Sequence, residues 1–112
     1  MTLTRRRVLA SAMCAPLAGP AFAQGWPQQT VKIVVPFPAG GSTDIVGRMV
    51  ASHLGKDLGH TVIIENMPGA TGTIGVAAAA RARPDGHTLL IGSVGTMVTN
   101  HFAYEKLPFA MD

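Results

Sequence analysis

The feature that most constrains this chain is a pair of glycine-rich loops, each of which joins an apolar, strand-like run to a helix-like segment. The first lies in VKIVVPFPAGGSTD at 31–44, and the second in MPGATGTIG at 67–75. The continuous β-branched run at 31–37 is typical of a strand buried on both faces of a parallel sheet. Backbone N–H groups and small hydroxyls at a helix N-terminus suit an anion. The two loops therefore predict an α/β protein with a site for a small carboxylate or phosphate.

The rest of the chain continues this alternation of strands and helices. We expect strands at 31–37, 61–65 and 88–93, and helices at 43–58, 73–83 and 95–104. Short connections between these elements imply right-handed crossovers, and therefore a parallel sheet with flanking helices. Ser42 or Thr43 is expected to cap the first helix, with Asp44 at its positive end and Gly59 at its C-terminus. Helical spacing predicts one apolar face on that helix, comprising Ile45, Val46, Met49, Val50, Leu54 and Leu58.

The first 23 residues have the features of a secretory signal peptide, which is removed from the mature protein. Three arginines at 5–7 precede an apolar run at 8–17, and the small residues of Ala21-Phe22-Ala23 provide a cleavage site. The segment 4–10 also resembles a twin-arginine signal, so that route and general secretion both remain open. Cys14 lies within the apolar run and follows the large Met13, which argues against a lipid anchor. A short buried or amphipathic helix is the less favoured interpretation of this segment.

Removal of the signal peptide changes the charge and the chemistry of the chain. Residues 24–112 contain six Lys and Arg against six Asp and Glu, so their net charge is near zero. The sequence pI of about 9.6 therefore reflects the export signal and gives no support to nucleic-acid binding. The mature segment also contains no cysteine. This excludes disulfides, thiol catalysis and cysteine-ligated metals in the exported product.

Several donor-rich segments follow the predicted strands. Taken alone, the loop at 38–44 is consistent with a tight strand-to-helix turn. The loop at 69–73 repeats the same chemistry after the second strand, and Ser93, Gly95 and Thr96 follow the third. Ligands of open α/β sheets bind outside the carboxyl ends of the strands, so this convergence favours a binding crevice.

Other site types do not fit the spacing of these residues. The glycines at 69, 72 and 75 do not form the dinucleotide fingerprint, and Gly40-Gly41 lacks the Lys-Ser/Thr of a P-loop. The four histidines are scattered, with no pair at metal-ligand spacing. Ser42 is not in a nucleophile elbow. Asp44 could serve as a general base, but a capping role is favoured.

Several of these motifs, in order and with matching spacing, resemble one known family. Trp26-Pro27, IVVPFPAGGSTDIVGR, VIIENMPGATGTIG, RARPDGHTLLIGSVGT and KLPF together cover residues 26–109. They are similar to the substrate-binding proteins of tripartite tricarboxylate transporters, the Bug-type periplasmic receptors. The resemblance implies a two-lobed, periplasmic-binding-protein-like α/β fold that closes on its ligand by a hinge.

The resemblance also implies a function and a set of site residues. A small carboxylate, such as a di- or tricarboxylate, is held mainly by loops of the first lobe, with ordered water at one carboxylate. Catalysis, a cofactor and a metal are not implied, and the partners are the membrane permease subunits of the transporter. We expect a periplasmic monomer. The ligand-binding residues carried over by motif are Phe37, Pro38, Ala39, Gly40, Gly41, Ser42, Thr43, Asp44, Gly69, Ala70, Thr71, Gly72, Thr73, Ile74, Ser93, Gly95 and Thr96.

The chain departs from the family pattern in length, because family members continue through a second lobe and return to the first. Residues 24–112 are therefore expected to be part of the N-terminal lobe. Two alternatives remain open at this point. One is the lobe of an α/β enzyme that binds a phosphorylated ligand, since glycine-rich helix N-termini serve phosphate equally well. The other is a fragment without function, whose sheet edge and apolar helix faces are incompletely covered.

Overall fold

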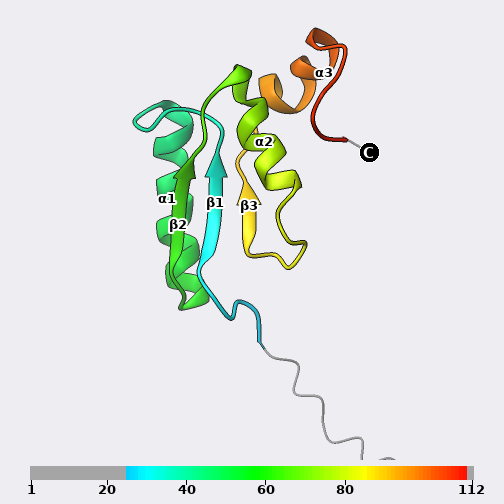
Figure 1. The fold of residues 1–112 in the computed structure, drawn as a ribbon. Helices are drawn as coiled ribbons and strands as arrows, with labels where there is room; N and C mark the ends of the chain where they lie inside the picture. The colour runs from blue at the N-terminus through cyan, green and yellow to red at the C-terminus, as the bar shows by residue number, and fades with distance from the viewer. Residues whose placement is uncertain (1–24, 111–112) are drawn as a thin grey trace, which may run out of the picture.

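The computed structural model describes residues 25–110, and these form alternating strands and helices (Figure 1). The predicted signal peptide at 1–23 lies outside the described residues. The elements are β1 (Val31–Val35), α1 (Ser42–Leu58), β2 (Val62–Asn66), the 3₁₀ turn η1 (Ala70–Gly72), α2 (Thr73–Ala80), β3 (Thr88–Leu90), the π-helical turn η2 (Gly95–Thr99) and α3 (Asn100–Ala103). Element types and order match the sequence-based prediction. The boundaries differ: β1 and β3 are shorter, α2 ends three residues early, and the last helix divides into η2 and α3.

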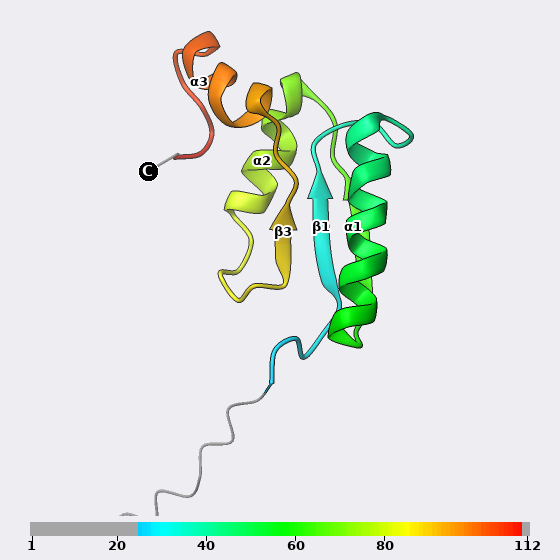
Figure 2. The same ribbon diagram turned by 180° about the vertical axis from the view of Figure 1, so that it is seen from behind.

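The three strands form one parallel sheet in the order β2-β1-β3. Val31 of β1 pairs with Val62 of β2, and Lys32 pairs with Thr88 of β3. The two ribbon views show α1 on one face of the sheet, behind β1 and β2, and α2 on the other face near β3 (Figures 1 and 2). The predicted parallel sheet with flanking helices is therefore confirmed. The chain passes from β1 to β2 on one side of β1 and then crosses to β3 on its other side. The carboxyl ends of β1 and β3 therefore mark a topological switch point, where the order of the strands reverses.

The hydrophobic core is centred on β1. Val31, Ile33, Val34 and Val35 are at most 2% exposed, as predicted for a strand covered on both faces. Burial of each such side chain contributes roughly 1.5–3 kcal/mol. Lys32, between them, extends to an ion pair with Glu65 of the neighbouring strand.

Helix α1 packs on the sheet mainly through its small residues, and of the apolar face predicted from the sequence only Leu54 and Leu58 are half-buried. Gly47 and Ala51 are buried, and a Cβ built on Gly47 would lie 3.2 Å from both Val35 and Ile91. A close helix–sheet approach leaves room only for small side chains at the contact. The larger residues Ile45, Val46, Met49 and Val50 are instead 45–59% exposed. The last three of these border an open groove of about 540 Å³ on the outer side of α1, lined by Val46, Met49, Val50, His53, Leu54 and Asp57.

The ends of α1 confirm one sequence-based prediction and correct another. The helix ends at Gly59, whose φ of 63° is the left-handed conformation expected of a C-terminal glycine. At the other end, the N-cap residue is Gly41, so Ser42 and Thr43 lie inside the first turn and do not cap it. Asp44 also lies in the first turn, but its carboxylate accepts the N–H of Gly40, which precedes the N-cap, so it holds the preceding loop and caps no N–H of the helix.

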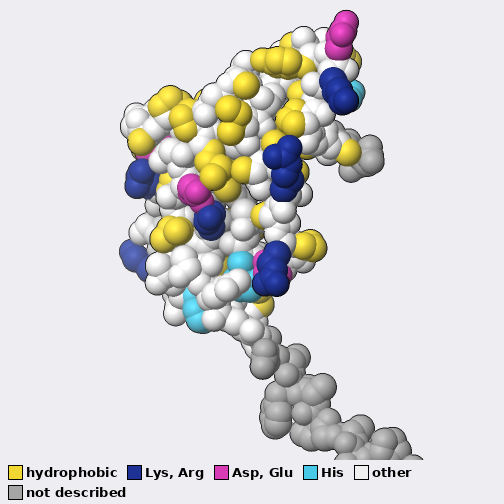
Figure 3. Space-filling view, viewed as in Figure 1, with side chains coloured by type: hydrophobic (Ala, Val, Ile, Leu, Met, Phe, Trp, Pro, Cys, Tyr) yellow, Lys and Arg dark blue, Asp and Glu magenta, His cyan; other side chains and the backbone are white. Residues whose placement is uncertain are grey.

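Apolar side chains are concentrated on one part of the surface, whereas charged side chains are spread over it (Figure 3). Apolar side chains gather toward the end of the molecule that carries the strand C-termini and α3, where Ile74, Val98 and Phe102 are exposed. Lys and Arg side chains are spread singly over the face in view. Within residues 25–110, no helix has both the length and the apolar character needed to cross a membrane.

Candidate functional site

Three loops meet at the carboxyl edge of the sheet, and two buried glycines allow them to do so. Gly72 has a φ of 87°, and a Cβ there would lie 2.5 Å from Thr96 Cγ2 and 3.4 Å from Pro36. A Cβ on Gly75 would lie 2.8 Å from Pro36 Cβ and 2.9 Å from the Met67 carbonyl oxygen. The loop after β2 therefore packs closely against both the loop after β1 and the loop after β3. The predicted convergence of the three donor-rich segments is present in the structure.

The carboxylate of Asp44, a residue only 2% exposed, holds the loop after β1 in place through hydrogen bonds. Its Oδ2 atom accepts hydrogen bonds from Arg48 Nε and the Gly40 N–H, both at 2.9 Å. Its Oδ1 atom accepts one from Asn66 Nδ2 at 2.9 Å, and the same nitrogen donates to the Phe37 carbonyl at 3.1 Å. The Arg48 hydrogen bond, followed by those from Gly40 and Asn66, lowers the pKa of Asp44 from 3.8 to about 2.

Asp44 is consequently an ionised anchor of the loop and not the expected helix cap, because none of its hydrogen bonds comes from an N–H of the first helical turn. Arg48 and Asn66, which complete this network, were not among the residues predicted for the site. The sequence signal for Arg48 is its spacing, since Asp and Arg four residues apart in a helix form neighbouring charges. Asn66 is brought to Asp44 by the pairing of β2 with β1. A contact across 22 residues of sequence leaves no local signal.

The loop after β2 has a rare backbone conformation. Four successive residues have positive φ: Gly69 at 126°, Ala70 at 45°, Thr71 at 56° and Gly72 at 87°. The left-handed region costs an L-residue such as Ala or Thr roughly 1–2 kcal/mol. Backbone strain of this kind persists where the surrounding structure fixes it, and it clusters at binding and catalytic sites.

The carbonyl groups of this strained loop all accept hydrogen bonds from the protein. The Gly72 N–H donates to Gly69 O at 2.9 Å, and Thr73 Oγ1 donates to Ala70 O at 2.8 Å. Asn100 Nδ2 donates to Thr71 O at 3.0 Å. In a helical turn of either hand, carbonyls point toward its end and N–H groups toward its start. The N–H groups of Ala70 and Thr71 therefore face away from the protein donors that bind their carbonyls, whereas the N–H of Gly72 is used by the Gly69 carbonyl.

The segment after β3 forms a compact turn around Thr96. The Ser93 N–H donates to Thr96 Oγ1 at 2.9 Å, and Thr96 Oγ1 donates to the Ser93 carbonyl at 3.0 Å. The Thr96 N–H in turn donates to Ser93 Oγ at 3.3 Å. Thr96 is buried while Ser93 is half-buried, so Thr96 shapes the turn and Ser93 lies nearer to solvent.

The predicted site residues divide into an exposed set and a supporting set. The exposed residues are Pro38, Ala39, Gly40, Gly41, Ser42, Gly69, Ala70, Thr71, Ile74 and Gly95. Those half-buried are Phe37, Thr43 and Ser93, and those buried are Asp44, Gly72, Thr73 and Thr96. The edge thus offers neutral backbone and hydroxyl donors to solvent, with buried residues beneath them. Among residues 25–110, no three His, Cys, Asp or Glu side chains come together as a metal site.

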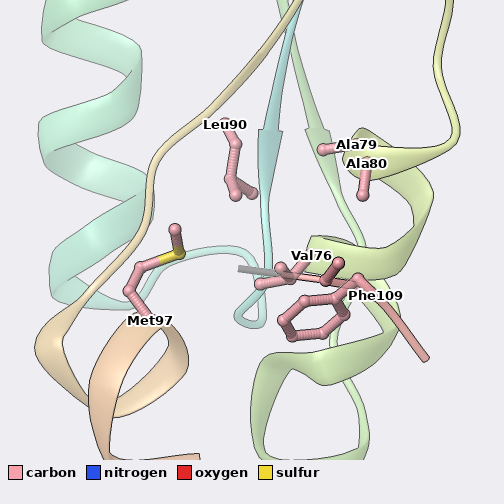
Figure 4. A pocket seen from close by; sticks show the side chains of 7 residues that line it. Val76, Ala79, Ala80, Leu90, Met97 and Phe109 are labelled. Carbon is pink, nitrogen blue, oxygen red and sulfur yellow. The ribbon is translucent and has the colours of Figure 1, made fainter. Parts of the chain in front are cut away.

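A separate cavity of about 450 Å³ lies between α2, β3, η2 and the segment around 109 (Figure 4). Its lining consists of Val76, Ala79, Ala80, Leu90, Met97, Phe109 and Ala110. The close-up shows the Phe109 ring beside Val76, with Leu90 and Met97 further along the cavity. These side chains are apolar, so the cavity does not suit an anion and is distinct from the donor-rich edge.

The sheet order, the switch point and the three donor-rich loops form the arrangement with which open α/β proteins bind ligands at the strand C-termini. The family model described as "Tripartite tricarboxylate transporter family receptor" matches residues 46–112. The chain therefore belongs to the family of tripartite tricarboxylate transporter receptors. The resemblance found in the sequence motifs is confirmed, and this is a family of receptors, not of enzymes.

Individual relatives agree with this assignment. A UPF0065 protein of Bordetella bronchiseptica is 39% identical over 107 residues, which is 96% of this chain and 32% of that protein. The chain thus spans about a third of the length of such curated relatives.

Two solved structures from Rhodopseudomonas palustris are also similar to this chain. Rpa4515 with adipate has a TM-score of 0.74 at 34% identity, over 78% of this chain and 29% of the other. MatC with bound malate has a TM-score of 0.70 at 45% identity, over 73% and 28%. Together with the matching structure of a periplasmic transporter, they confirm the periplasmic-binding-protein-like fold class.

Proposed function

We propose that this chain forms part of the ligand-binding lobe of a periplasmic receptor, which captures a small carboxylate for a tripartite tricarboxylate-type membrane transporter. The observation that carries the proposal is the meeting of three loops with neutral donors at the switch point of the sheet. The family and the two neighbours whose titles name adipate and malate support it. Neither the family nor these neighbours favours the α/β enzyme lobe.

The proposed ligand contacts are those expected from the motifs, through the donors that the protein does not use itself, since the N–H groups of Gly40, Gly41 and Ser93 already donate to Asp44, Pro38 O and Thr96 Oγ1. N–H and hydroxyl groups bind a carboxylate through charge-assisted hydrogen bonds, and ordered water can extend them. No ion pair is required, which leaves the ligand free to dissociate toward a transporter. The negative charge of Asp44 beneath the first loop is neutralised by Arg48, so it opposes an incoming carboxylate only weakly.

We also propose how the receptor is exported to the periplasm, where it meets its ligand. The signal peptide is cleaved after Ala23, by the general secretory or the twin-arginine route, and the mature receptor acts in the periplasm as a monomer. The permease subunits of the transporter are its partners. The receptor itself performs no catalysis.

Isothermal titration calorimetry tests the ligand class. The mature product of the whole reading frame that contains this chain is titrated with malate, adipate and citrate, and with inorganic phosphate and AMP for comparison. We expect saturable binding of at least one of the carboxylates. Binding of phosphate or AMP with no response to any carboxylate would favour the enzyme alternative.

A matched pair of serine variants tests the position of the site. Ser42 lies exposed in the first loop region, and Ser52 lies exposed ten residues further along the same helix. If Ser42 contacts the ligand, Ser42→Ala weakens carboxylate binding about tenfold, since a hydrogen bond to a charged group contributes about 1.5–3 kcal/mol. Ser52→Ala should leave the affinity unchanged. Equal affinities for both variants would remove Ser42 from the site.

A further inference from the structure

The loop after β2 is fixed at its most strained residue by a distant part of the chain. Asn100, at the start of α3, donates from Nδ2 to the Thr71 carbonyl at 3.0 Å. The hydroxyl oxygens of Tyr104 and Thr71 are 2.9 Å apart and share a hydrogen bond. Asn100 is only 3% exposed, whereas Tyr104 is 40% exposed. The carbonyl and the hydroxyl of Thr71 are therefore both bound by the segment that follows β3.

This arrangement differs from the bonds made by the neighbouring loop residues. The carbonyls of Gly69 and Ala70 accept from Gly72 and Thr73, which lie within three residues of them. Such short-range bonds move with the loop and do not anchor it. Asn100 instead connects Thr71 to an element 29 residues later, and η2 also packs against the loop where Thr96 faces Gly72. An L-residue stays in the left-handed region only when its surroundings hold it there.

We propose that Asn100 and Tyr104 are positioning residues for ligand binding. They hold Thr71 in its left-handed conformation, and this keeps the N–H groups of Ala70 and Thr71 turned toward the side from which a carboxylate approaches. Neither residue needs to touch the ligand. The inference rests on the proposed carboxylate-binding function, and it adds to it the part of the chain that sets the geometry of the second loop.

Three variants of the product of the whole reading frame test the proposal. Asn100→Asp keeps the volume of the side chain but removes the N–H donor facing Thr71 O. Tyr104→Phe removes one hydroxyl from a partly exposed ring. Thr99→Val is the matched control, because Thr99 is exposed on η2 beside Asn100. Two quantities are measured: the dissociation constants for malate and adipate, and the amide hydrogen exchange rates without ligand of Gly72 and Thr73, whose N–H groups donate to Gly69 O and Ala70 O.

We expect Asn100→Asp to raise the dissociation constants and the two exchange rates about tenfold, and Tyr104→Phe to raise them about threefold. Exchange of the β1 amides should stay at the wild-type rate, which a general loss of stability would not allow. Thr99→Val should behave as wild type. If Asn100→Asp fails to fold, the dissociation constants and exchange rates of Tyr104→Phe alone test the proposal. Wild-type exchange and affinity in the variants that fold would overturn the proposal.

The exchange measurement separates this proposal from the proposed function. If the wild-type protein binds neither malate nor adipate, the choice of ligand has failed, while the exchange rates still report on the loop. Acceleration confined to Gly72 and Thr73 would then support the positioning role. Unchanged rates would overturn it, whatever the protein binds.

Discussion

At the scale of single residues, the most heavily used side chain is the carboxylate of Asp44. It connects the backbone at Gly40, the guanidinium of Arg48 and the amide of Asn66. Asn in its place keeps the size but loses the charge that strengthens these hydrogen bonds. We expect Asp44→Asn to lower the melting temperature by about 5 °C. Asp57→Asn, at an exposed position of the same helix, is the control and should leave the melting temperature unchanged. An equal melting temperature for Asp44→Asn would contradict the structural role.

The lowered pKa of Asp44 also predicts a dependence of stability on pH. Since the folded pKa of about 2 lies below the ordinary 3.8, the unfolded chain binds a proton at a higher pH than the folded protein does. The resulting stabilisation is complete above pH 3.8 and is lost as the pH falls toward 2. Hydrogen bonding with His87 lowers the pKa of Asp85 in the same direction, so the wild-type curve contains both effects.

Comparison of wild type with Asp44→Asn isolates the first of these two carboxylates. Urea unfolding is measured at pH 5.5, 4, 3 and 2.5, and the difference in free energy of unfolding is plotted against pH. It should be constant above pH 4 and shrink toward pH 2.5. A difference that does not change over this range would show that the folded pKa of Asp44 is not lowered.

His87 forms a second residue-scale network at the opposite end of the sheet. Its Nε2 atom accepts the Gln28 N–H at 3.3 Å, its backbone N–H donates to Asp85 Oδ1 at 3.0 Å, and its ring packs at an angle against Trp26. We expect His87→Ala to release the segment 26–28 and to lower the free energy of unfolding by about 1 kcal/mol. Carboxylate affinity should not change, because this network lies at the amino ends of the strands. A loss of affinity in calorimetry would contradict that separation.

At the scale of elements, the packing of α2 depends on the missing side chain of Gly75. A methyl group there would lie 2.8 Å from Pro36 Cβ and 2.9 Å from Pro36 Cα and Met67 O. Two of these neighbours are backbone atoms, which cannot rotate away. We expect Gly75→Ala to destabilise the protein by about 1–3 kcal/mol, despite the higher helix propensity of Ala. For Gly95→Ala, the nearest atom would be Ser93 Oγ at 3.5 Å, so its stability should be unchanged or higher. Urea unfolding of both variants provides the comparison.

The elements also show which features the sequence could predict. The β-branched run of β1 and the left-handed end of α1 at Gly59 were predictable, because residue type alone determines them. The buried face of α1 was not. An apolar stripe normally marks the face of a helix that packs on the core. Here the short distance between α1 and the sheet selects Gly47 and Ala51, and that distance is a tertiary property.

The features of the candidate site also fall into two groups, those that local sequence predicts and those that depend on tertiary structure. Its loops and their position at the strand ends follow from glycine, hydroxyl and strand patterns that can be read locally. The bonds that hold those loops do not, since Asn66 reaches Phe37 across 29 residues and Asn100 reaches Thr71 across the same separation. Each of these asparagines is a common turn or helix-end residue, and its role arises only when the parallel strands are paired.

At the scale of the whole molecule, the outer face of α1 remains a large apolar surface. Ile45, Val46, Met49 and Val50 are about half exposed there. Soluble proteins seldom expose contiguous apolar patches of this kind without an interaction that covers them. We therefore expect residues 24–112, produced alone, to bind the dye ANS and to self-associate. Light scattering and ANS fluorescence measure both properties, and a monodisperse monomer without ANS binding would contradict this expectation.

Two methionines distinguish this exposed surface from the core of the same segment. Met49 is 59% exposed on α1, whereas Met97 is half-buried, and a Cβ on Gly92 would lie 2.6 Å from its Cγ. Met49→Lys should reduce self-association and leave the free energy of unfolding within about 0.5 kcal/mol, as for other surface substitutions. Met97→Lys places a charge beside the apolar cavity and should cost about 2–4 kcal/mol. Equal destabilisation by both substitutions would mean that α1 packs through its apolar stripe in solution, with Gly47 and Ala51 turned away from the sheet.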